Sequence, residues 1–425
     1  MLSSRLSLSN SNSSVFFAAG VFGVILGLIW DGPFYLIGVL FLFPILWYVF
    51  RPYESFFFVF MYYLVSTKSI PLIFSNYYQL HSTLIYSKYI LLWMIYSLFL
   101  SIPWLIVKII LIKHDYKKHK FLKLKESFFI LIPLISSVFP PLYFIGVGSP
   151  LEASGVLFPG LKLYGICLFF SLILLIISMI KSVNIVNHKK YLMNYLFLVI
   201  IITTSISCNI IYKAPKTPKK WIAISTEFPK EINNKNENFI RYIILVTSIK
   251  SIIDKGYKVL IFPENAIGLW NNNRKKLWDG IANYAKNRRA IILSGAFIQF
   301  DEKKYSKINS GIIAFGKQNG VIYLTRQPVP ISEWIPFSSK GITAHWFSKG
   351  INVISDVKVS FLVCYEELLP GLIITSFLSF QEPKMIISVV NNWMGSGTGE
   401  RRSQFNSLFV MARLFGVPFL RSWNR

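Results

Sequence analysis

The chain has 425 residues, a formal net charge of +26 and 53% hydrophobic residues, which gather in long uncharged runs. This composition is typical of an integral membrane protein and argues against a purely soluble one. Its three cysteines are too few for a disulfide scaffold and lack the spacing of a zinc site, so neither metal nor cofactor is expected.

Apolar runs fill the first half of the sequence and predict a transmembrane domain of about seven helices over residues 1–212. Most of the runs approach the ~20 residues that a helix needs to cross a bilayer. The seven runs are 15–30, 33–50, 56–76, 84–112, 127–146, 161–180 and 191–212.

Two details of these runs bear on packing. Ala19, Gly23 and Gly27 are small residues at intervals of four positions, which predicts that the first helix packs closely on a neighbour. The run at 56–76 is the weakest, because Lys68 and Pro71 interrupt it, and it could be partly re-entrant.

The positive charges between the runs indicate orientation. The linkers 113–125 and 181–190 are rich in lysine and the turn at Arg51 is basic, whereas 147–161 has neither Lys nor Arg. Because positive loops stay in the cytoplasm, seven spans place the N-terminus inside and the chain after residue 212 outside. The sequence therefore predicts a multi-pass protein of a bacterial inner membrane with a periplasmic C-terminal domain. Since much of the charge serves orientation, no direct nucleic-acid partner is expected.

A Pro/Lys-rich linker at 213–220 separates the membrane half from residues 221–425, whose composition suits one soluble domain. Strand patterns alternate with helix patterns here, which predicts an α/β fold with helices flanking sheets. The expected strands are 221–226, 258–263, 290–296, 311–315, 321–324, 357–363 and 385–390, and the expected helices are 236–255, 272–287 and 369–379.

Polar residues follow three of the predicted core strands, and ligand sites of α/β sheets lie at such carboxyl ends. Taken singly, Cys364 could be a small buried hydrophobe and Glu264 a loop or helix-cap carboxylate. Brought together from separate strands, they could act as nucleophile and general base. The three segments are Pro263-Glu264-Asn265, Cys364-Tyr365-Glu366 and Asn391-Asn392-Trp393.

These motifs as a set resemble the nitrilase (carbon–nitrogen hydrolase) superfamily, and with the membrane half they resemble its apolipoprotein N-acyltransferase branch. Segments 326–334 and 414–425 are most similar to the TraB family of conjugal-transfer proteins, acyltransferase-like relatives encoded with plasmid transfer systems. The likeness spans nearly the whole chain and is sharpest from 257 to 425. The matching residues are Phe262-Pro263-Glu264-Asn265, Asn309-Ser310, a basic residue near 326, Val363-Cys364-Tyr365-Glu366 and Asn391-Asn392-Trp393.

The resemblance implies an αββα sandwich with a Glu–Lys–Cys triad. Glu264 would match the general base, and Cys364 the nucleophile that carries an acyl group as a thioester. Glu366 would match a supporting carboxylate, and Glu333 an acidic residue in the loop after the lysine. The other residues expected to support the site are Tyr365, Asn391, Asn392 and Trp393.

The sequence departs from the family pattern in two places. Thr325-Arg326 stands where the family has its lysine, and we expect Arg326 to act as an electrostatic stand-in for that cation. Arginine holds a charge that can stabilise an oxyanion, but it is a poor proton donor. The sequence stops at Arg425, where the acyltransferase continues, so the domain is expected to be C-terminally short or typical of TraB relatives.

We therefore expect a membrane-anchored acyltransferase or amidase-like protein that acts through a cysteine thioester in plasmid conjugal transfer. Its expected partners are a phospholipid or other acyl donor in the membrane, together with lipoprotein or conjugation components. Two alternatives remain open: a catalytically impaired assembly component of a conjugation apparatus, and a genuine apolipoprotein N-acyltransferase. A Cys364–His345 dyad is a weaker possibility, and His345 is better explained as a loop residue.

Overall fold

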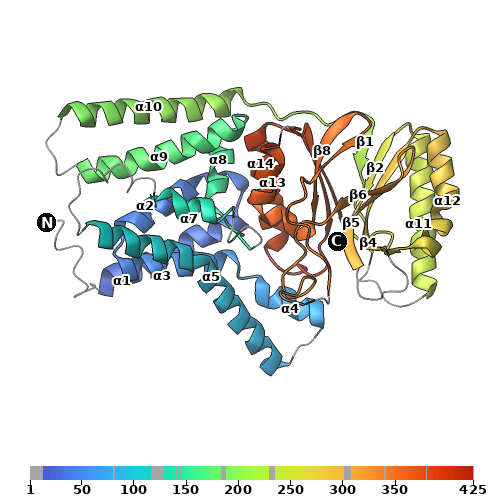
Figure 1. Cartoon of the computed structure of the whole chain (residues 1–425), viewed down its shortest axis with the longest axis horizontal. Coiled ribbons are helices and arrows are strands. Elements are labelled where there is room, and N and C mark those ends of the chain that lie inside the picture. The colour runs from blue at the N-terminus through green and yellow to red at the C-terminus, as the bar shows by residue number, and fades with distance from the viewer. Residues whose placement is uncertain are drawn as a thin grey trace.

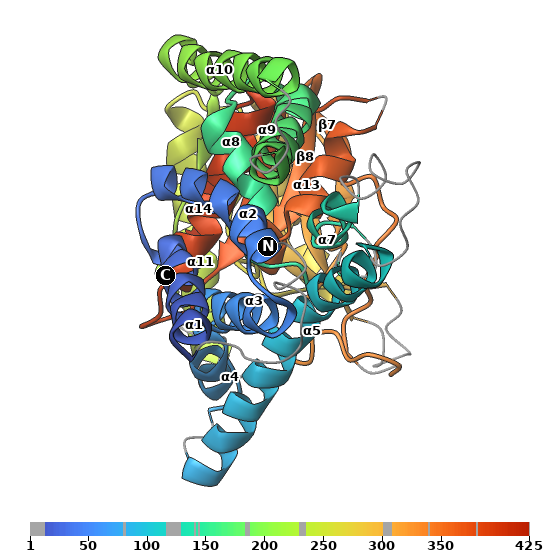
Figure 2. The same cartoon turned by 90° about the vertical axis from the view of Figure 1, so that its left-hand side faces the viewer.

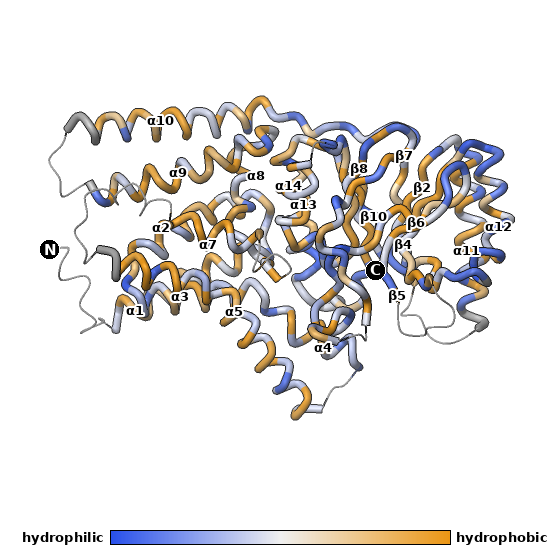
Figure 3. The backbone as a smooth tube through the Cα atoms, in the orientation of Figure 1, coloured by the Kyte–Doolittle hydropathy of each residue, from blue (hydrophilic) through white to orange (hydrophobic). Residues whose placement is uncertain are grey.

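The computed structural model shows an apolar helical half joined to an α/β domain (Figure 1). Hydropathy colouring separates the two, because polar residues gather on the outer helices of the α/β domain (Figure 3). The N-terminal tail 1–12, the lysine-rich segment 116–128 and Arg425, which carried predictions above, lie outside the described residues. The structure describes residues 13–79, 82–115, 129–139, 142, 145–182, 188–228, 235–300, 308–338, 341–379 and 381–424.

In the described part of the chain, five helical segments are long and apolar enough to cross a membrane, and they correspond to five of the seven predicted runs. The run at 33–50 forms a shorter pair, the 3-10 helix η3 (Phe34–Phe41) and α2 (Leu42–Val49). The run at 127–146 is only partly described and includes α7 (Leu131–Ser136). The five are α1 (Ser13–Leu28) with η2 (Ile29–Asp31), α3 (Pro52–Ser66) with α4 (Ile70–Tyr78), α5 (Thr83–Asp115), α9 (Lys162–Ser182) and α10 (His188–Ile211).

Small residues let α1 approach α3 closely, which confirms the prediction made from their spacing. A Cβ atom on Gly23 would lie 2.4 Å from the backbone oxygen of Phe58, and one on Gly27 would lie 2.7 Å from Cβ of Val65. Both distances are too short for real side-chain contacts, so the backbones could not pack this way with larger residues. The helix α10, in contrast, lies at the edge of the bundle (Figure 2).

The weakest predicted span breaks between α3 and α4. Lys68, in the break, forms an ion pair with Asp31, and Pro71 occupies the first turn of α4, where a missing backbone N–H costs little. The break lets α4 turn towards the α/β domain (Figure 1). There Asn76 Nδ2 donates to Met394 O at 2.9 Å, and Tyr77 OH donates to Ser332 O at 3.2 Å.

Two sheets pack face to face in the α/β domain. Neighbouring side chains of β2 (Val259–Phe262) alternate between layers: Val259 and Ile261 face the second sheet, while Leu260 and Phe262 face the outer helices. The first sheet has the order β1-β2-β4-β5-β6, with β3 paired to β4, and the second has the order β10-β9-β8-β7. The strands are β1 (Trp221–Ala223), β3 (Leu269–Trp270), β4 (Ile291–Gln299), β5 (Ile308–Gly316), β6 (Gly320–Leu324), β7 (Ile351–Ile354), β8 (Val357–Val363), β9 (Met385–Asn391) and β10 (Phe419–Asn424).

Helices cover both outer faces of this sandwich, which confirms the predicted αββα arrangement. The first sheet packs against α11 (Lys235–Asp254) and α12 (Asn272–Asn287). The second sheet packs against α13 (Pro370–Phe377) and α14 (Glu400–Phe415).

The helix α14 joins the two halves of the molecule. Its buried residues belong to one apolar core that contains both Ile386 of the second sheet and Phe169 of the membrane half. A Cβ atom on Gly155, in α8 (Ala153–Leu157), would lie only 2.0 Å from the backbone oxygen of Val410. Asn406 Nδ2 also donates to Gly32 O at 2.9 Å. The α/β domain therefore packs directly against the helical half, in addition to being connected to it by the linker.

This contact gives a stability prediction. Gly155→Ala should lower the free energy of unfolding by about 1–3 kcal/mol, because the added methyl group must force α8 and α14 apart. The matched control is Gly280→Ala in α12, where nothing lies within 4 Å of an added Cβ, and it should be neutral or stabilising by up to about 1 kcal/mol. Thermal unfolding in detergent micelles compares the two, and equal melting temperatures would contradict the close contact.

Candidate active site

Cys364 is the first residue after β8 and begins the short 3-10 helix η6 (Cys364–Leu368). Its φ of +49° is in the left-handed region, which is unfavourable for a residue with a side chain and tends to mark functional sites. Because β8 and β9 are parallel neighbours, the end of β9 lies beside this turn. The Sγ atom accordingly lies 3.9 Å from Asn391 O, its backbone hydrogen-bond acceptor.

Glu264 reaches the same place from the other sheet, where it follows β2. One carboxylate oxygen, Oε2, accepts the backbone N–H of Asn391 at 3.2 Å. The Cys364 thiol lies close enough to this carboxylate for each group to affect the pKa of the other. The structure thus brings together a nucleophile and a base that are a hundred positions apart in the sequence, with Asn391 contacting both.

Burial and nearby negative charges favour the protonated, neutral forms of Glu264 and Cys364. Burial raises the pKa of Glu264, and the nearby Glu333 raises it further, while interactions with Cys364 and with the Asn391 N–H lower it. Burial also raises the pKa of the Cys364 thiol, followed by the negative charges of Glu264 and Glu333. The thiol therefore stays protonated at neutral pH, and Glu264 can accept its proton only in the ionised form, which the hydrogen bond from the Asn391 N–H favours.

Glu333 lies in the loop after β6, where its Oε2 accepts the backbone N–H of Val329 at 3.1 Å. Burial raises the pKa of Glu333 to about 7, partly offset by this hydrogen bond. The loop packs on α4 through the bond between Tyr77 and Ser332. Glu333 is therefore fixed near the reacting pair and can change charge close to neutral pH.

Glu366 is fully buried, and its carboxylate connects several segments of the site through hydrogen bonds. Its carboxylate accepts the hydroxyl of Tyr323 at 2.8 and 2.7 Å and the backbone N–H groups of Arg326 at 2.6 Å and Gln327 at 3.1 Å. It also accepts the N–H of Val363 at 2.7 Å, directly before the cysteine. One carboxylate thus ties the turn that carries Cys364 to the segment after β6.

The placement of Arg326 corrects the expectation that it supplies a cation beside Cys364. Its guanidinium is buried beneath α13, where Nη1 donates to Leu372 O at 2.8 Å and to Ser376 Oγ at 3.2 Å. The residues that line the pocket at Cys364 do not include Arg326. Thr325, directly before it, has a buried hydroxyl oxygen with no hydrogen-bond partner in the described residues.

Arg421, on β10, is a cation that the sequence did not indicate for this site. It forms two 2.8 Å hydrogen bonds with the buried carboxylate of Glu367, and its charge interacts with Cys364. The carboxylate partner offsets much of that positive charge. Arg421 therefore gives Cys364 weaker support than an unpaired cation would.

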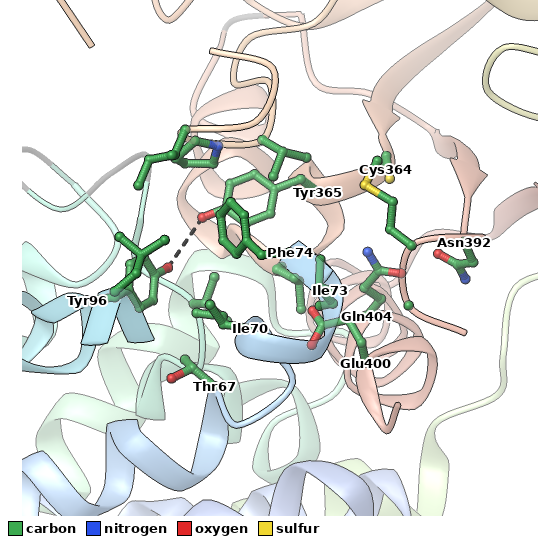
Figure 4. Close-up of a pocket in the computed structure, with 18 of the residues that line it drawn as sticks. Thr67, Ile70, Ile73, Phe74, Tyr96, Cys364, Tyr365, Asn392, Glu400 and Gln404 are labelled. Carbon is green, nitrogen blue, oxygen red and sulfur yellow. Dashed lines mark hydrogen bonds between the residues drawn. The ribbon is translucent and has the colours of Figure 1, made fainter. Parts of the chain in front are cut away.

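The side chain of Cys364 lines a largely apolar pocket between the α/β domain and the helices α4 and α5 (Figure 4). Its volume of about 120 Å³ is comparable to apolar cavities of ~150 Å³ that admit benzene, so an acyl chain could enter in part. The lining residues contributed by the helical half are Ser66, Thr67, Ile70, Ile73, Phe74, Leu92, Tyr96 and Val147.

Tyr365 and Asn392, two of the remaining predicted site residues, line this pocket, and Trp393 does not. Tyr365 lines it, with its hydroxyl 3.4 Å from that of Tyr96 on α5, and Asn392 lines the opposite side. Trp393 stacks on Tyr77 of α4 at a centroid distance of 6.1 Å. These contacts place Tyr365 and Trp393 at the junction between the two halves.

His345 lies elsewhere, with Nε2 3.0 Å from Asn309 Oδ1, so the geometry gives no dyad with Cys364. Among the residues that the structure describes, no group of three His, Cys, Asp or Glu side chains could hold a metal ion.

Sequence reasoning missed the pocket walls. Lys68 and Pro71 indicated that the run containing α4 could be partly re-entrant, but not that α4 forms a wall of this pocket. Glu400 and Gln404 on α14 also line the pocket. Their spacing of four residues places both on one face of α14, but the sequence analysis predicted no helix at 400–415.

Comparison with known proteins supports the resemblance predicted from the motifs, although no protein-family model matches the chain. It is similar to the probable conjugal transfer protein TraB of Sinorhizobium fredii, with 26% identity over 305 residues, covering 70% of this chain and 73% of that protein. It is also similar to the conjugal transfer protein TraB of Agrobacterium fabrum, with 22% identity over 290 residues, covering 67% of this chain and 64% of that protein. The predicted similarity to TraB proteins is confirmed.

Solved structures of nitrilase-superfamily proteins overlap with about half of the chain. A mutant amidase from Nesterenkonia matches with a TM-score of 0.35 and 11% identity, covering 48% of this chain and 74% of the amidase. A carbon–nitrogen hydrolase from Helicobacter pylori matches with a TM-score of 0.34 and 10% identity, covering 48% and 72%. The fold described above rests on the sheets and helices themselves.

The position of Arg326 leads to a prediction about stability. Arg326→Met should lower the free energy of unfolding by about 3 kcal/mol, because it removes charge-assisted hydrogen bonds to Tyr323, Leu372 and Ser376 and takes the nearby positive charge from the buried Glu366 carboxylate. Thermal unfolding measures this effect, with Lys349→Met, at an exposed position nearby, as the control. Unchanged stability of Arg326→Met would contradict the buried placement.

Proposed function

We propose that this chain is a membrane-embedded acyltransferase or amidase-like protein that carries an acyl group on Cys364 as a thioester. The observation that carries the proposal is that Cys364 and Glu264 meet at the main chain of Asn391 beside an apolar pocket: Sγ lies 3.9 Å from Asn391 O, and Glu264 Oε2 accepts the Asn391 N–H at 3.2 Å. A nucleophile and a base held side by side meet the geometric requirement of nucleophilic catalysis. The similarity to TraB proteins suggests that the activity serves plasmid conjugal transfer.

The proposed step begins when Glu264 takes the proton from Sγ of Cys364. The thiolate adds to the carbonyl carbon of an ester or amide, and a tetrahedral oxyanion forms. The bond to the leaving alcohol or amine then breaks, and the leaving group takes the proton from Glu264. This leaves a thioester on Cys364 and a neutral alcohol or amine. Water or an acceptor amine releases the acyl group in a second step that restores the thiol.

The acyl donor that best suits the pocket is a phospholipid of the surrounding membrane. The pocket is lined by apolar side chains of the membrane helices, among them Ile70, Ile73 and Leu92. An acyl chain leaving the bilayer beside α4 and α5 would bury apolar surface in this pocket, at about 25 cal/mol per Å². A lipoprotein or a component of the conjugation apparatus is the proposed acceptor.

The proposed orientation places the N-terminus in the cytoplasm and the α/β domain in the periplasm of a bacterial inner membrane. Basic residues gather around Tyr48: Lys108 Nζ donates to its backbone oxygen at 2.7 Å, and Lys181 Nζ lies 5.2 Å from its ring centroid. Such basic ends favour the cytoplasmic side. The segment 34–49 would also cross, since its 3-10 half rises about 2.0 Å per residue and its α half about 1.5 Å, roughly 28 Å in all.

A second candidate function is a non-catalytic assembly component, and one observation favours it. Thr325-Arg326 stands where the resemblance implies a lysine, and the Arg326 guanidinium is buried in the protein interior. The thiol then faces two carboxylates with less positive charge to stabilise its anion. A genuine apolipoprotein N-acyltransferase remains the third candidate, which differs from the first in its acceptor.

The thioester can be tested directly. Full-length protein in lipid nanodiscs, incubated with phospholipid and digested at low pH, should give a Cys364 peptide that carries the mass of one acyl group. Glu264→Gln should reduce this adduct by at least about 100-fold, because general-base removal typically costs 10²–10⁴ in rate. Cys167, which is exposed, is the internal control and should stay unmodified. Absence of the adduct in every lipid mixture would contradict the proposal.

The two candidate functions differ in their response to a restored lysine. Thr325→Lys should raise the rate of Cys364 acylation about tenfold or more, because a cation near the thiol favours both the thiolate and the oxyanion. Thr325→Met has a similar length without charge and should give no gain. If neither variant changes the rate and Cys364→Ala still supports plasmid transfer, the assembly role is favoured.

A further inference from the structure

The outer face of α11 changes character halfway along the helix. Its inner side packs against the first sheet through residues such as Ile249. The exposed positions of its second half are polar, among them Lys250 and Asp254, as expected for a helix at a protein surface. The exposed positions of its first half, among the side chains that the structure describes, are instead apolar. These are Phe239 at 60%, Ile240 at 56%, Ile243 at 46% and Ile244 at 48% exposure.

The place of this apolar patch, formed by Phe239, Ile240, Ile243 and Ile244, excludes the surrounding lipid as its cover. A helix that is apolar on every side is normally buried, and clustered apolar residues on a protein surface mark interaction sites. Figure 1 shows α11 and α12 at the end of the molecule away from the helical half. The bilayer that surrounds the membrane helices therefore cannot reach the patch.

A small cavity between α11 and α12 adjoins the patch. Asn238 and Arg241 line it from α11, and Arg274 and Trp278 line it from α12. Asn238 and Arg241 flank the first two residues of the patch in the sequence, so the cavity and the patch are contiguous on α11. The volume of the cavity, about 10 Å³, is close to the ~10–15 Å³ that one water molecule needs, so it can receive a single small polar group.

The chemistry of the cavity selects a negatively charged acceptor. Trp278 is only 2% exposed, yet its Nε1 has no hydrogen-bond partner among the described residues. An indole N–H can only donate, and leaving a buried donor unsatisfied is costly, so an oxygen atom is favoured there. Arg274, in the first turn of α12, and the positive end of that helix dipole favour an oxygen with negative charge. A carboxylate group meets both requirements.

The charge around the patch favours an acidic partner over a second copy of this chain. The helix α12 carries four basic residues and one acidic residue, Asp279. A symmetric dimer through this surface would bring the basic residues of both copies together, and like charges across an interface are unfavourable. An acidic partner would be attracted instead. The basic residues are Arg274, Lys275, Lys276 and Lys286.

We propose that the apolar patch on α11 and the adjoining cavity form a docking surface for an acidic amphipathic segment of another protein. Apolar side chains of that segment cover the patch. One of its carboxylates enters the cavity, accepts the Trp278 N–H and pairs with Arg274. The surface is formed by the outer helices of the first sheet, whereas the Cys364 pocket adjoins the helical half, so docking does not depend on the proposed reaction.

Site-specific photocrosslinking in the cells that naturally express the protein tests the docking. The photoreactive residue p-benzoylphenylalanine replaces Ile243 in the full-length chain, and mass spectrometry identifies what it captures. We expect crosslinks to another protein, through a peptide that contains acidic and apolar residues. The same probe in place of Ser251, an exposed polar position further along α11, is the matched control and should capture about tenfold less of that protein.

Substitutions then separate docking from chance capture. Ile240→Asp and Arg274→Glu should each lower the yield of the position-243 crosslink about tenfold, because the first puts a charge into the apolar contact and the second repels the carboxylate. Trp278→Phe removes the single N–H donor and should lower the yield as well. Ser251→Asp should leave it unchanged. If Trp278→Phe lowers the melting temperature, Ile240→Asp and Arg274→Glu decide the test.

A charge exchange gives the sharpest support. Changing the captured carboxylate of the partner to Lys should restore crosslinking to Arg274→Glu but not to the wild-type chain.

Three results would overturn the inference: no crosslink at position 243, capture only of lipid or of a second copy of this chain, or capture of a protein that Ile240→Asp and Arg274→Glu leave unaffected. None of them bears on the thioester proposal, because the Cys364 adduct is measured separately and should form at the wild-type level in all these variants.

Discussion

The architecture of the site depends on one buried carboxylate. Glu366 accepts hydrogen bonds from the segment after β6 and from the residue before Cys364, so two loops from different sheets are fixed by a single group. Burying a carboxylate is costly unless its oxygens are satisfied, and here backbone N–H groups and the Tyr323 hydroxyl satisfy them. Because most of these donors are backbone groups, the turn that presents Cys364 is set by main-chain geometry and not by flexible side chains.

The same burial governs the chemistry. The negative charge of Glu333 raises the pKa of Glu264, and the charges of both carboxylates raise the pKa of Cys364, so the resting site favours neutral groups. Two nearby cations form hydrogen bonds with other partners: Arg326 donates to α13, and Arg421 donates to Glu367. Reactivity therefore depends on direct proton transfer between Cys364 and Glu264, with limited help from fixed positive charge.

The sequence predicted the parts of this arrangement that follow from local patterns. Alternating strand patterns and the polar residues after them placed Glu264 and Cys364 at one edge of the sheets, because the carboxyl ends of strands carry sites. Small residues on α1 predicted its close contact with α3. The direction of Arg326 could not be predicted, because Thr325 and Arg326 lie beyond the end of a strand, where tertiary contacts decide which way each side chain points. The part of the pocket that α4 lines could not be predicted either, because it depends on the direction that the chain takes after the break between α3 and α4.

The membrane half emerges as part of the site, because its helices form one wall of the pocket and its core continues into α14. The central claim is that an acyl chain lies in this pocket, attached to Cys364. The most direct measurement is a cryo-EM map of the full-length protein in a phospholipid nanodisc. The account predicts density continuous from Sγ of Cys364 that runs between α4 and α5, with the Glu264 carboxyl adjacent. An empty pocket with Glu264 and Cys364 out of hydrogen-bonding reach would contradict it.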